Sequence, residues 1–309
     1  MAITAAMVKE LRELSGAGMM DCKKALNETN GNMDEAMEFL RKNGQAKAEK
    51  KASRIAAEGI VKVAVDGTTA AIVEVNSETD FVAKNEKFQT YVEKVANQAL
   101  ASDAADMDAF MEEAWVEDTS KTVKDVLVEQ VAVIGENLKI RRFEKITAEN
   151  GCVVDYIHGG GRIGVVVVAE TATVNDTVTE AMKNIAMQIA ALNPKYVSRD
   201  EISAEFIEHE KEILKAQIMN DPKESQKPEK VITGMIEGRI SKELKEICLV
   251  DQVYVKAEDG KQSVAKYLEA VSKEVGTPVS VKKFIRFETG EGLEKKNEDF
   301  AAEVAAQLG

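Results

Sequence analysis

Few residues of this 309-residue chain have the types and spacing that bond-breaking chemistry requires. Neither of the two histidines, His158 and His209, has a Cys, Asp or Glu at the spacing of a recognisable zinc motif. The three cysteines, Cys22, Cys152 and Cys248, lie too far apart for a C-x-x-C site and are predicted to be reduced thiols. Because nucleophile-elbow and phosphate-loop motifs are also missing, we expect no metal site, no cofactor and no enzymatic activity.

One glycine motif imitates a cofactor fingerprint. The stretch GGGRIG, residues 159–164, matches G-x-G-x-x-G, whose glycines follow a strand and open a helix that binds a pyrophosphate. Here the glycines precede VVVV, which indicates a strand, so the sequence predicts a tight turn beside His158. An enzyme that uses His158 and this turn is the alternative, and it predicts that a nucleotide raises thermal stability.

The stretch SETDFVAKNEKF, residues 77–88, is a second candidate site, and its chemistry would be recognition. Ser77 and Asp80 satisfy the S-x-x-[DE] box, which predicts a helix that begins near Ser77 with Asp80 in its first turn. Phe81 has two interpretations: the first core residue of that helix, or a rigid apolar anchor that protrudes toward a partner. The pattern leaves both open, because the apolar residues that follow do not fit one narrow stripe.

The charge balance disfavours nucleic acid as a partner. Against 54 acidic side chains stand 41 basic ones, a net charge of −13, which repels phosphate backbones. The basic stretch RKNGQAKAEKKASR, residues 41–54, is interpreted as a helical linker. RNA or ribosome binding through this stretch and the segment VKKFIR is the alternative, and it predicts a steep salt dependence.

The location of the protein follows from its hydropathy. The longest apolar run, near IGVVVVA, is far too short to span a bilayer. The first residues lack the basic and apolar regions of a signal peptide. We therefore expect a cytoplasmic, ordered protein without a membrane contact.

The periodicity of the chain predicts an α+β fold that starts with a small three-helix bundle. Three helical patterns end at Gly16, Gly31 and Gly44. Met19 and Met20 follow the first of these stops, where they serve either as core residues or as an exposed adhesive pair.

The centre of the chain contains two related β-β-α subdomains. GIVKVAVDGTTAAIVEV reads as a hairpin around Asp66-Gly67, followed by one helix. The same plan recurs in CVVDYIHGGGRIGVVVVAE and the helix TVTEAMKNIAMQIAAL. A mostly helical stretch with Trp115 connects the copies and ends in a strand.

An antiparallel helical arm interrupts the second copy. The box Ser198-x-x-Glu201 predicts a long helix over 199–220, two prolines break it, and a second helix returns. Its narrow apolar seam indicates either a projecting coiled-coil arm or a hairpin packed on the sheet. The strand VSVKKFIRFE and a C-terminal helix follow. The predicted boundaries are 1–54 (bundle and linker), 55–145 (first subdomain), 146–197 and 249–290 (second subdomain), 198–248 (arm) and 291–309 (C-terminal module).

Five ordered segments make the chain resemble the bacterial elongation factor Ts family over its whole length. They are VKELRELSGAGMMDCKKAL, EVNSETDFVAKNEKF, IGENLKIRR, HGGGRIGV and FIRFETGEGLEKKNEDFAAEVAA. The resemblance implies a bundle like that of ubiquitin-associated domains, two core subdomains, a coiled-coil arm and a closing helix. It also implies a guanine-nucleotide exchange factor for the GTPase elongation factor Tu, active in translation elongation.

By this resemblance, Asp80 and Phe81 of the T-D-F-V motif insert into the GTPase domain and disturb its magnesium and phosphate site. The arm would serve as a partner contact or join copies into a homodimer or heterotetramer, and the seam leaves this open. The spacing in HGGGRIG is longer than the family pattern implies. The partner-binding residues implied are Lys9, Arg12, Met19, Met20, Lys23, Thr79, Asp80, Phe81, Val82, Ile134, Gly135, Glu136, His158 and Phe300.

Overall fold

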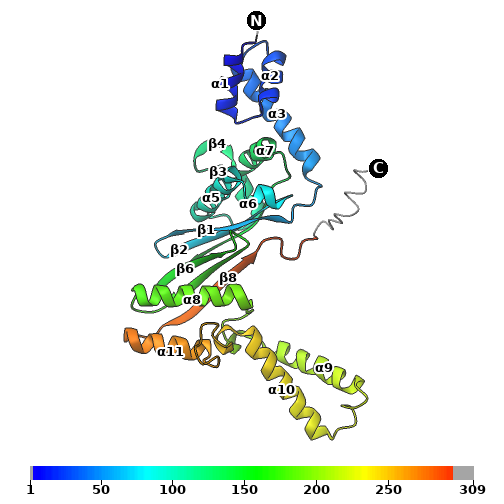
Figure 1. Ribbon diagram of the computed structural model, residues 1–309, viewed down its shortest axis with the longest axis vertical. Helices are drawn as coiled ribbons and strands as arrows, with labels where there is room; N and C mark the ends of the chain where they lie inside the picture. The colour runs from blue at the N-terminus through cyan, green and yellow to red at the C-terminus, as the bar shows by residue number, and fades with distance from the viewer. Residues whose placement is uncertain (1–2, 295–309) are drawn as a thin grey trace.

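The computed structural model describes residues 3–294 and confirms the mixed α+β class. Its parts follow one another along the longest axis (Figure 1): a three-helix bundle, two α/β halves whose sheets face each other, and a helical hairpin. The predicted C-terminal module covers residues 291–309, of which the structure describes 291–294 as a turn. The helix predicted there, with Phe300, lies outside the described residues.

The N-terminal bundle consists of α1 (Ala5–Ser15), α2 (Met19–Glu28) and α3 (Met33–Lys51). The prediction that the third helix ends at Gly44 is wrong, because α3 continues to Lys51. Gly44 is buried against helix α7 (Val123–Ile134), where a Cβ atom would lie 3.4 Å from the Cβ of Ala132. This glycine therefore permits close helix packing instead of ending the helix. The core of the bundle contains Leu11, Cys22, Ala25, Leu26 and Ala36.

The first half is built on an antiparallel sheet of strand order β1-β2-β5. Its elements are β1 (Glu58–Asp66), β2 (Thr69–Ser77), α4 (Asp80–Ala83), α5 (Glu86–Ala101), α6 (Met107–Glu112), β3 (Ala114–Trp115), β4 (Asp118–Thr122), α7 (Val123–Ile134) and β5 (Lys139–Thr147). The single helix predicted behind the hairpin is thus two helices, and Asn85 caps the second. Trp115, expected among helices, lies in the short strand β3.

The second half repeats this plan with strand order β6-β7-β8. Its elements are β6 (Gly151–His158), β7 (Ile163–Glu170), α8 (Asp176–Leu192), α11 (Val264–Val275) and β8 (Ser280–Glu288). Helix α11 is absent from the sequence predictions, although Ser263 caps its start and Gly276 ends it in the left-handed conformation.

Two buried glutamines show how closely the halves correspond. Gln98 on α5 donates to the carbonyl of Ala114 at 3.2 Å and accepts from the amide of Val116 at 2.8 Å. In the second half, Gln188 on α8 donates to the carbonyl of Val253 at 3.0 Å and accepts from the amide of Val255 at 2.8 Å. In each half one side-chain amide therefore holds an extended segment against the sheet-covering helix, so the duplication includes side-chain chemistry.

The inner faces of the two sheets pack against each other, with α5 and α8 on the outer faces (Figure 1). Close approach depends on Gly161, whose φ is +104° and whose carbonyl accepts from the Val61 amide at 2.7 Å. A Cβ atom on Gly161 would lie 2.7 Å from the Cβ of Ile60. The glycine turn that contains Gly161 therefore has a structural role, since it connects the two halves. The inter-sheet core contains Val61, Ala70, Ile72, Ala148, Val153, Val166, Val168, Ile285 and Phe287.

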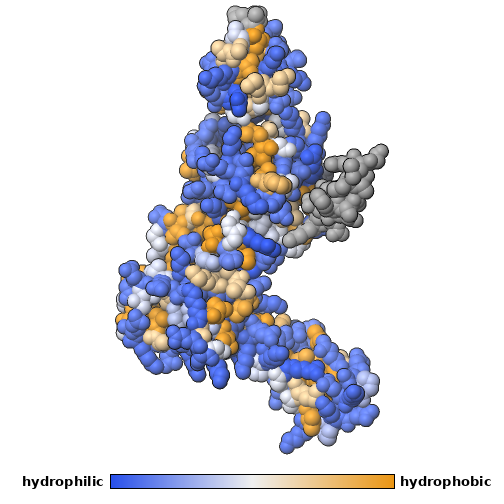
Figure 2. All heavy atoms as spheres, viewed as in Figure 1, coloured by the Kyte–Doolittle hydropathy of each residue, from blue (hydrophilic) through white to orange (hydrophobic). Residues whose placement is uncertain are grey.

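The hairpin inserted in the second half, between α8 and α11, consists of α9 (Ala204–Asn220) and α10 (Glu229–Ile247), and it projects from the body (Figure 1). Apolar residues run along it between polar flanks (Figure 2). The predicted start of its first helix is wrong: Ser198 caps a short 3-10 turn, Arg199–Glu201, and α9 begins after Ser203. Glu201 accepts from the Val197 amide at 2.8 Å, so the box closes a turn that does not extend into the helix.

A buried carboxylate joins the first sheet to the turn after β8. Glu74 of β2 is fully buried and pairs with Arg141 at 3.0 Å and Arg142 at 2.6 Å. It also accepts from the amide of Gly290 at 2.8 Å and from the side chain of Asn76 at 3.1 Å. Burial opposes its charge, but these hydrogen bonds and the arginines together lower the pKa of Glu74 below its usual value.

Candidate protein-binding surface

Phe81 protrudes from the molecule. Its side chain is 82% exposed, whereas Phe88 on the next helix is fully buried in the core of the first half. Of the two interpretations of Phe81, the structure supports the protruding anchor. An exposed aromatic ring of this kind is typical of residues that dominate protein interfaces.

Helix α4, which presents Phe81, is only four residues long and needs support from its surroundings. Thr79 caps it, because the Thr79 hydroxyl accepts from the amide of Val82 at 3.3 Å. The predicted cap at Ser77 is wrong, since Ser77 is the last residue of β2 and its hydroxyl donates to the carbonyl of Thr79. The true cap places Asp80 and Phe81 in the first turn, beyond the strand.

Glu136, which is distant in sequence from this turn, contacts it directly and supports it. Helix α7 ends at Gly135, whose φ of +90° turns the chain, and Glu136 then points at the start of α4. One carboxylate oxygen accepts from the amides of Glu78 and Thr79, each at 3.1 Å. The other accepts from the hydroxyl of Thr79 at 2.7 Å. Of the predicted residues of this region, Ile134 and Val82 are half-buried, and Glu136 holds the cap of the Phe81 helix directly.

Asp80 is exposed and lies beside Lys84, whose ammonium donates to it at 2.6 Å. This hydrogen bond lowers the pKa of the Asp80 carboxyl below its usual value. Phe81 is thus flanked by an ionised carboxylate at neutral pH. A docking partner would meet an apolar ring next to a negative charge.

The N-terminal bundle exposes a second apolar surface. Met19 and Met20 at the start of α2 are 60% and 73% exposed, so the adhesive alternative fits them better than the core one. Leu14 at the end of α1 is 64% exposed and was missed, because its spacing fits the buried stripe of that helix. The predicted cationic residues Lys9, Arg12 and Lys23 are exposed as well.

His158 lies apart from these residues, at the end of β6. It is exposed, and its Nδ1 atom is 2.9 Å from the hydroxyl of Tyr156. Within residues 3–294 no hydrogen bond or ion pair connects His158 to the Phe81 helix. Gly159 and Gly160, which follow it, have positive φ angles and form a tight turn, as predicted.

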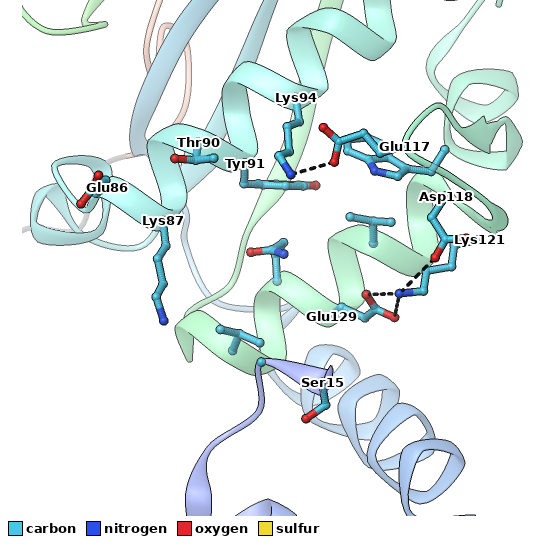
Figure 3. A pocket seen from close by; sticks show the side chains of 15 residues that line it. Ser15, Glu86, Lys87, Thr90, Tyr91, Lys94, Glu117, Asp118, Lys121 and Glu129 are labelled. Atoms are coloured by element: carbon cyan, nitrogen blue, oxygen red, sulfur yellow. Dashed lines mark hydrogen bonds and ion pairs between the residues drawn. The ribbon is translucent and has the colours of Figure 1, made fainter. Parts of the chain in front are cut away.

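Hollows separate the bundle from the first half. One, of about 650 Å³, lies between Gly16 of the bundle and helices α5 and α7 (Figure 3). The pairs Lys94–Glu117 and Lys121–Glu129 span it at 2.7 and 3.0 Å. A second, of about 810 Å³, lies between α3 and α7. Part of the charged lining of the first hollow is thus already paired, whereas Glu86 and Lys87 form no ion pair within residues 3–294.

The part of the chain from residue 3 to residue 294 contains no cluster of His, Cys, Asp and Glu side chains able to hold a metal ion. None of its helices combines the length and the apolar character needed to cross a membrane.

Comparisons with known proteins agree with these features. The family model described as "Elongation factor TS" matches residues 78–291. Elongation factor Ts of Clostridioides difficile (strain 630) is 52% identical over 308 residues, 99% of each chain. That of Clostridium novyi (strain NT) is 50% identical over 308 residues, also 99% of each chain. The family model covers the Phe81 helix and the hairpin, and the two relatives also cover both halves in full. The chain belongs to the elongation factor Ts family.

Proposed function

We propose that this protein acts in translation elongation as the guanine-nucleotide exchange factor of the GTPase elongation factor Tu, in the cytoplasm. The observation that carries the proposal is Phe81, 82% exposed on a short helix that Glu136 and Thr79 hold in place. Membership of the elongation factor Ts family supports it. In the proposed complex, Asp80 and Phe81 insert into the GTPase domain, disturb its magnesium and phosphate site, and so release GDP.

The mechanism requires differential binding and no covalent step. A factor that binds the nucleotide-free GTPase more tightly than the GDP form must weaken GDP binding by the same factor, because the coupling is reciprocal. Burying one phenylalanine contributes about 1.5 to 3 kcal/mol, or roughly one to two decades of affinity. Since nucleotide exchange requires more binding free energy than this, further contacts must contribute the rest.

We assign those further contacts to several surfaces. Leu14, Met19 and Met20 with the neighbouring cations Lys9, Arg12 and Lys23 would grip the GTPase domain, through a bundle of the ubiquitin-associated type. His158 would help the second half reach another domain of the GTPase, and the region of Phe300 would embrace the GTPase domain. The hairpin would act as a coiled-coil arm that contacts the partner or a second copy.

The physical features of the surface favour a protein partner. A net charge of −13 opposes RNA binding, and four of the six basic residues at 41–54 already form ion pairs, for example Arg41 with Asp125 at 3.0 Å. The glycine turn beside His158 is committed to packing the sheets together. Neither alternative explains an exposed phenylalanine on a braced turn.

The proposal is tested by release of a fluorescent GDP from elongation factor Tu, with wild-type protein, Phe81→Ala and a control variant, Val65→Ala. Val65 is also exposed, at 43%, but its strand partner is Ala70, at the opposite end of the hairpin from Ser77. We expect strong acceleration by wild type and by Val65→Ala. For Phe81→Ala we expect a rate lower by about ten- to a hundredfold. If folded wild-type protein leaves GDP release unchanged, the proposed function is wrong.

A further inference from the structure

Three segments distant in sequence meet at the start of helix α4. They are the end of α3 with the residues after it (51–54), the turn after α7 (135–137) and the turn after β2 (78–82). The contacts of Glu136 described above connect the second of these with the third. The first segment belongs to the N-terminal bundle, so its contacts decide how the bundle relates to Phe81.

The end of α3 contacts both of the other segments. The ammonium of Lys51 donates to the carbonyl of Gly135, the residue that turns the chain toward Glu136. The guanidinium of Arg54 pairs with Glu78 at 3.3 Å, and Glu78 accepts from the amide of Asn137 at 2.6 Å. The side chain of Asn137 in turn donates to the carbonyl of Arg54 at 2.8 Å.

These contacts also balance charge. Glu78 and Glu136 place two carboxylates beside the cap of a four-residue helix, where they would repel each other. Lys51 and Arg54 are the cations that reach this site from the bundle side. Burial, with Arg54 as a second cause, lowers the pKa of Lys51, while Glu78 and Glu136 act in the opposite direction.

The rest of the bundle contacts the first half along helix α7. Helix α3 meets α7 at Gly44 and Ala132 and through the pair Arg41–Asp125, and the hollows of about 650 and 810 Å³ flank this contact. The network at 51–54 is therefore a second attachment point, and it is the one that connects to the Phe81 helix.

We propose that Lys51 and Arg54 are positioning residues: they fasten the end of the N-terminal bundle to the turn that presents Phe81, so that the Met19–Met20 surface and the Phe81 anchor are held as one unit. The inference rests on the proposed function, which it deepens by assigning a role to residues that contact no part of the GTPase in this scheme. Holding the two surfaces together spares the complex the entropy of ordering the Phe81 turn on binding.

The first test uses the full-length free protein, without any partner. Hydrogen exchange by mass spectrometry is measured on peptides over residues 77–84 in wild type, in Lys51→Met/Arg54→Met and in Lys50→Met. Lys50 is exposed, and within the described chain it forms no ion pair, so it is a matched control on the same helix. We expect exchange over 77–84 to be at least about tenfold faster in the double variant, because it removes the two charge-assisted hydrogen bonds of Lys51 and Arg54, and unchanged in Lys50→Met.

The second readout separates positioning from direct contact. If the competent arrangement of the turn is populated about ten times less, the factor concentration for half-maximal GDP release rises about tenfold while the maximal rate stays. The variant Lys51→Arg/Arg54→Lys keeps the charges and the hydrogen-bond donors. It should therefore restore the wild-type hydrogen exchange over 77–84 and the wild-type half-maximal concentration. A direct contact such as Phe81 would lower the maximal rate as well.

The outcomes are distinguishable from those that test the proposed function. Unchanged hydrogen exchange over 77–84 in the double variant overturns the inference, whatever the GDP assay shows. Exchange that rises equally over strand β7 also overturns it, because the two residues would then serve overall stability only. Failure of wild type to release GDP refutes the proposed function, whereas selective loosening of 77–84 would still establish the brace.

Discussion

Truncation of Glu74 should lower the free energy of unfolding strongly, although it removes few atoms. Its carboxylate is fully buried and accepts from Arg141, Arg142, Asn76 and the amide of Gly290. In Glu74→Ala the guanidinium of Arg141, 20% exposed, loses its counter-charge, and that of Arg142, 30% exposed, keeps only Glu291 at 3.3 Å. The Gly290 amide loses its acceptor. Breaking a buried ion pair from one side costs about 3 to 5 kcal/mol.

The matched isostere separates charge from hydrogen bonding. Glu74→Gln keeps the volume and one acceptor oxygen, so we expect a smaller loss, about 1 to 3 kcal/mol. Glu170→Gln is the exposed control, since its pair with Lys282 spans 3.7 Å in solvent and should be worth at most about 1 kcal/mol. Urea denaturation, followed by circular dichroism, measures all three as changes in midpoint at constant slope.

The same residue sets a pH dependence whose sign is fixed. Its folded-state pKa is lowered below the ordinary value of 4.5, so the carboxylate stabilises the fold above pH 4.5 and this contribution is lost as the pH falls further. Wild type should therefore lose stability more steeply than Glu74→Gln as the pH falls below 4.5. The reasoning is refuted if Glu74→Ala unfolds within about 1 kcal/mol of wild type, or if Glu74→Gln shows the same acid limb.

Two further substitutions test other parts of the fold. Gly161→Ala should cost about 1 to 3 kcal/mol in urea denaturation or prevent folding, because φ is +104° and the new Cβ would lie 2.7 Å from that of Ile60. Gly160→Ala, with φ of +67° and open space around it, should cost only about 1 to 2 kcal/mol, and equal costs would contradict the proposed sheet contact. Tyr91→Phe should leave thermal stability unchanged or raise it, because the buried Tyr91 hydroxyl has no hydrogen-bond partner among residues 3–294 and burial raises its pKa. A fall in melting temperature would show that this hydroxyl has a partner.

Periodicity predicted much of the architecture, since hairpins, helix faces and the arm depend on local patterns. It failed where tertiary contacts override them. Gly44 carries the sequence signal of a helix stop, yet the small side chain of Ala132 makes it a packing site within a longer helix. Ser77 fits the capping-box pattern, with Asp80 three residues on, whereas Thr79 has Val82 at that step. Thr79 is nevertheless the cap, because β2 extends to Ser77.

The sequence pointed to the candidate contact residues, but it did not point to the residues that support them. Phe81 drew attention because an aromatic residue stood at an unusual place in the pattern, but no pattern could decide that it protrudes. Lys51, Arg54 and Asn137 converge on Glu78 and Gly135 from distant parts of the chain, and such convergence is a property of the fold. Leu14 was missed for the converse reason, since a helical stripe predicts burial even where no element covers it.

The duplication explains why the bundle docks on one half and not on the other. Helices α7 and α11 occupy equivalent places, each between a hydroxyl cap and a left-handed glycine. On the face of α7 that meets the bundle lie Val128, Ala132 and Val133, and Ala132 contacts Gly44. The residues at the corresponding steps of α11 are Glu269, Lys273 and Glu274, which are exposed and charged.

A face that is apolar and small in one copy and charged in the other indicates that the first copy was shaped around a permanent neighbour. The same copy carries Glu136, directly after its left-handed glycine, whereas the second copy has Thr277 at that step. The docking face and the brace of Phe81 thus lie on the same helix and the turn that ends it. This placement would allow the position of the N-terminal bundle to influence the position of Phe81. The bundle and the turn before Phe81 both contact α7 or the turn that ends it, and α7 is rigid.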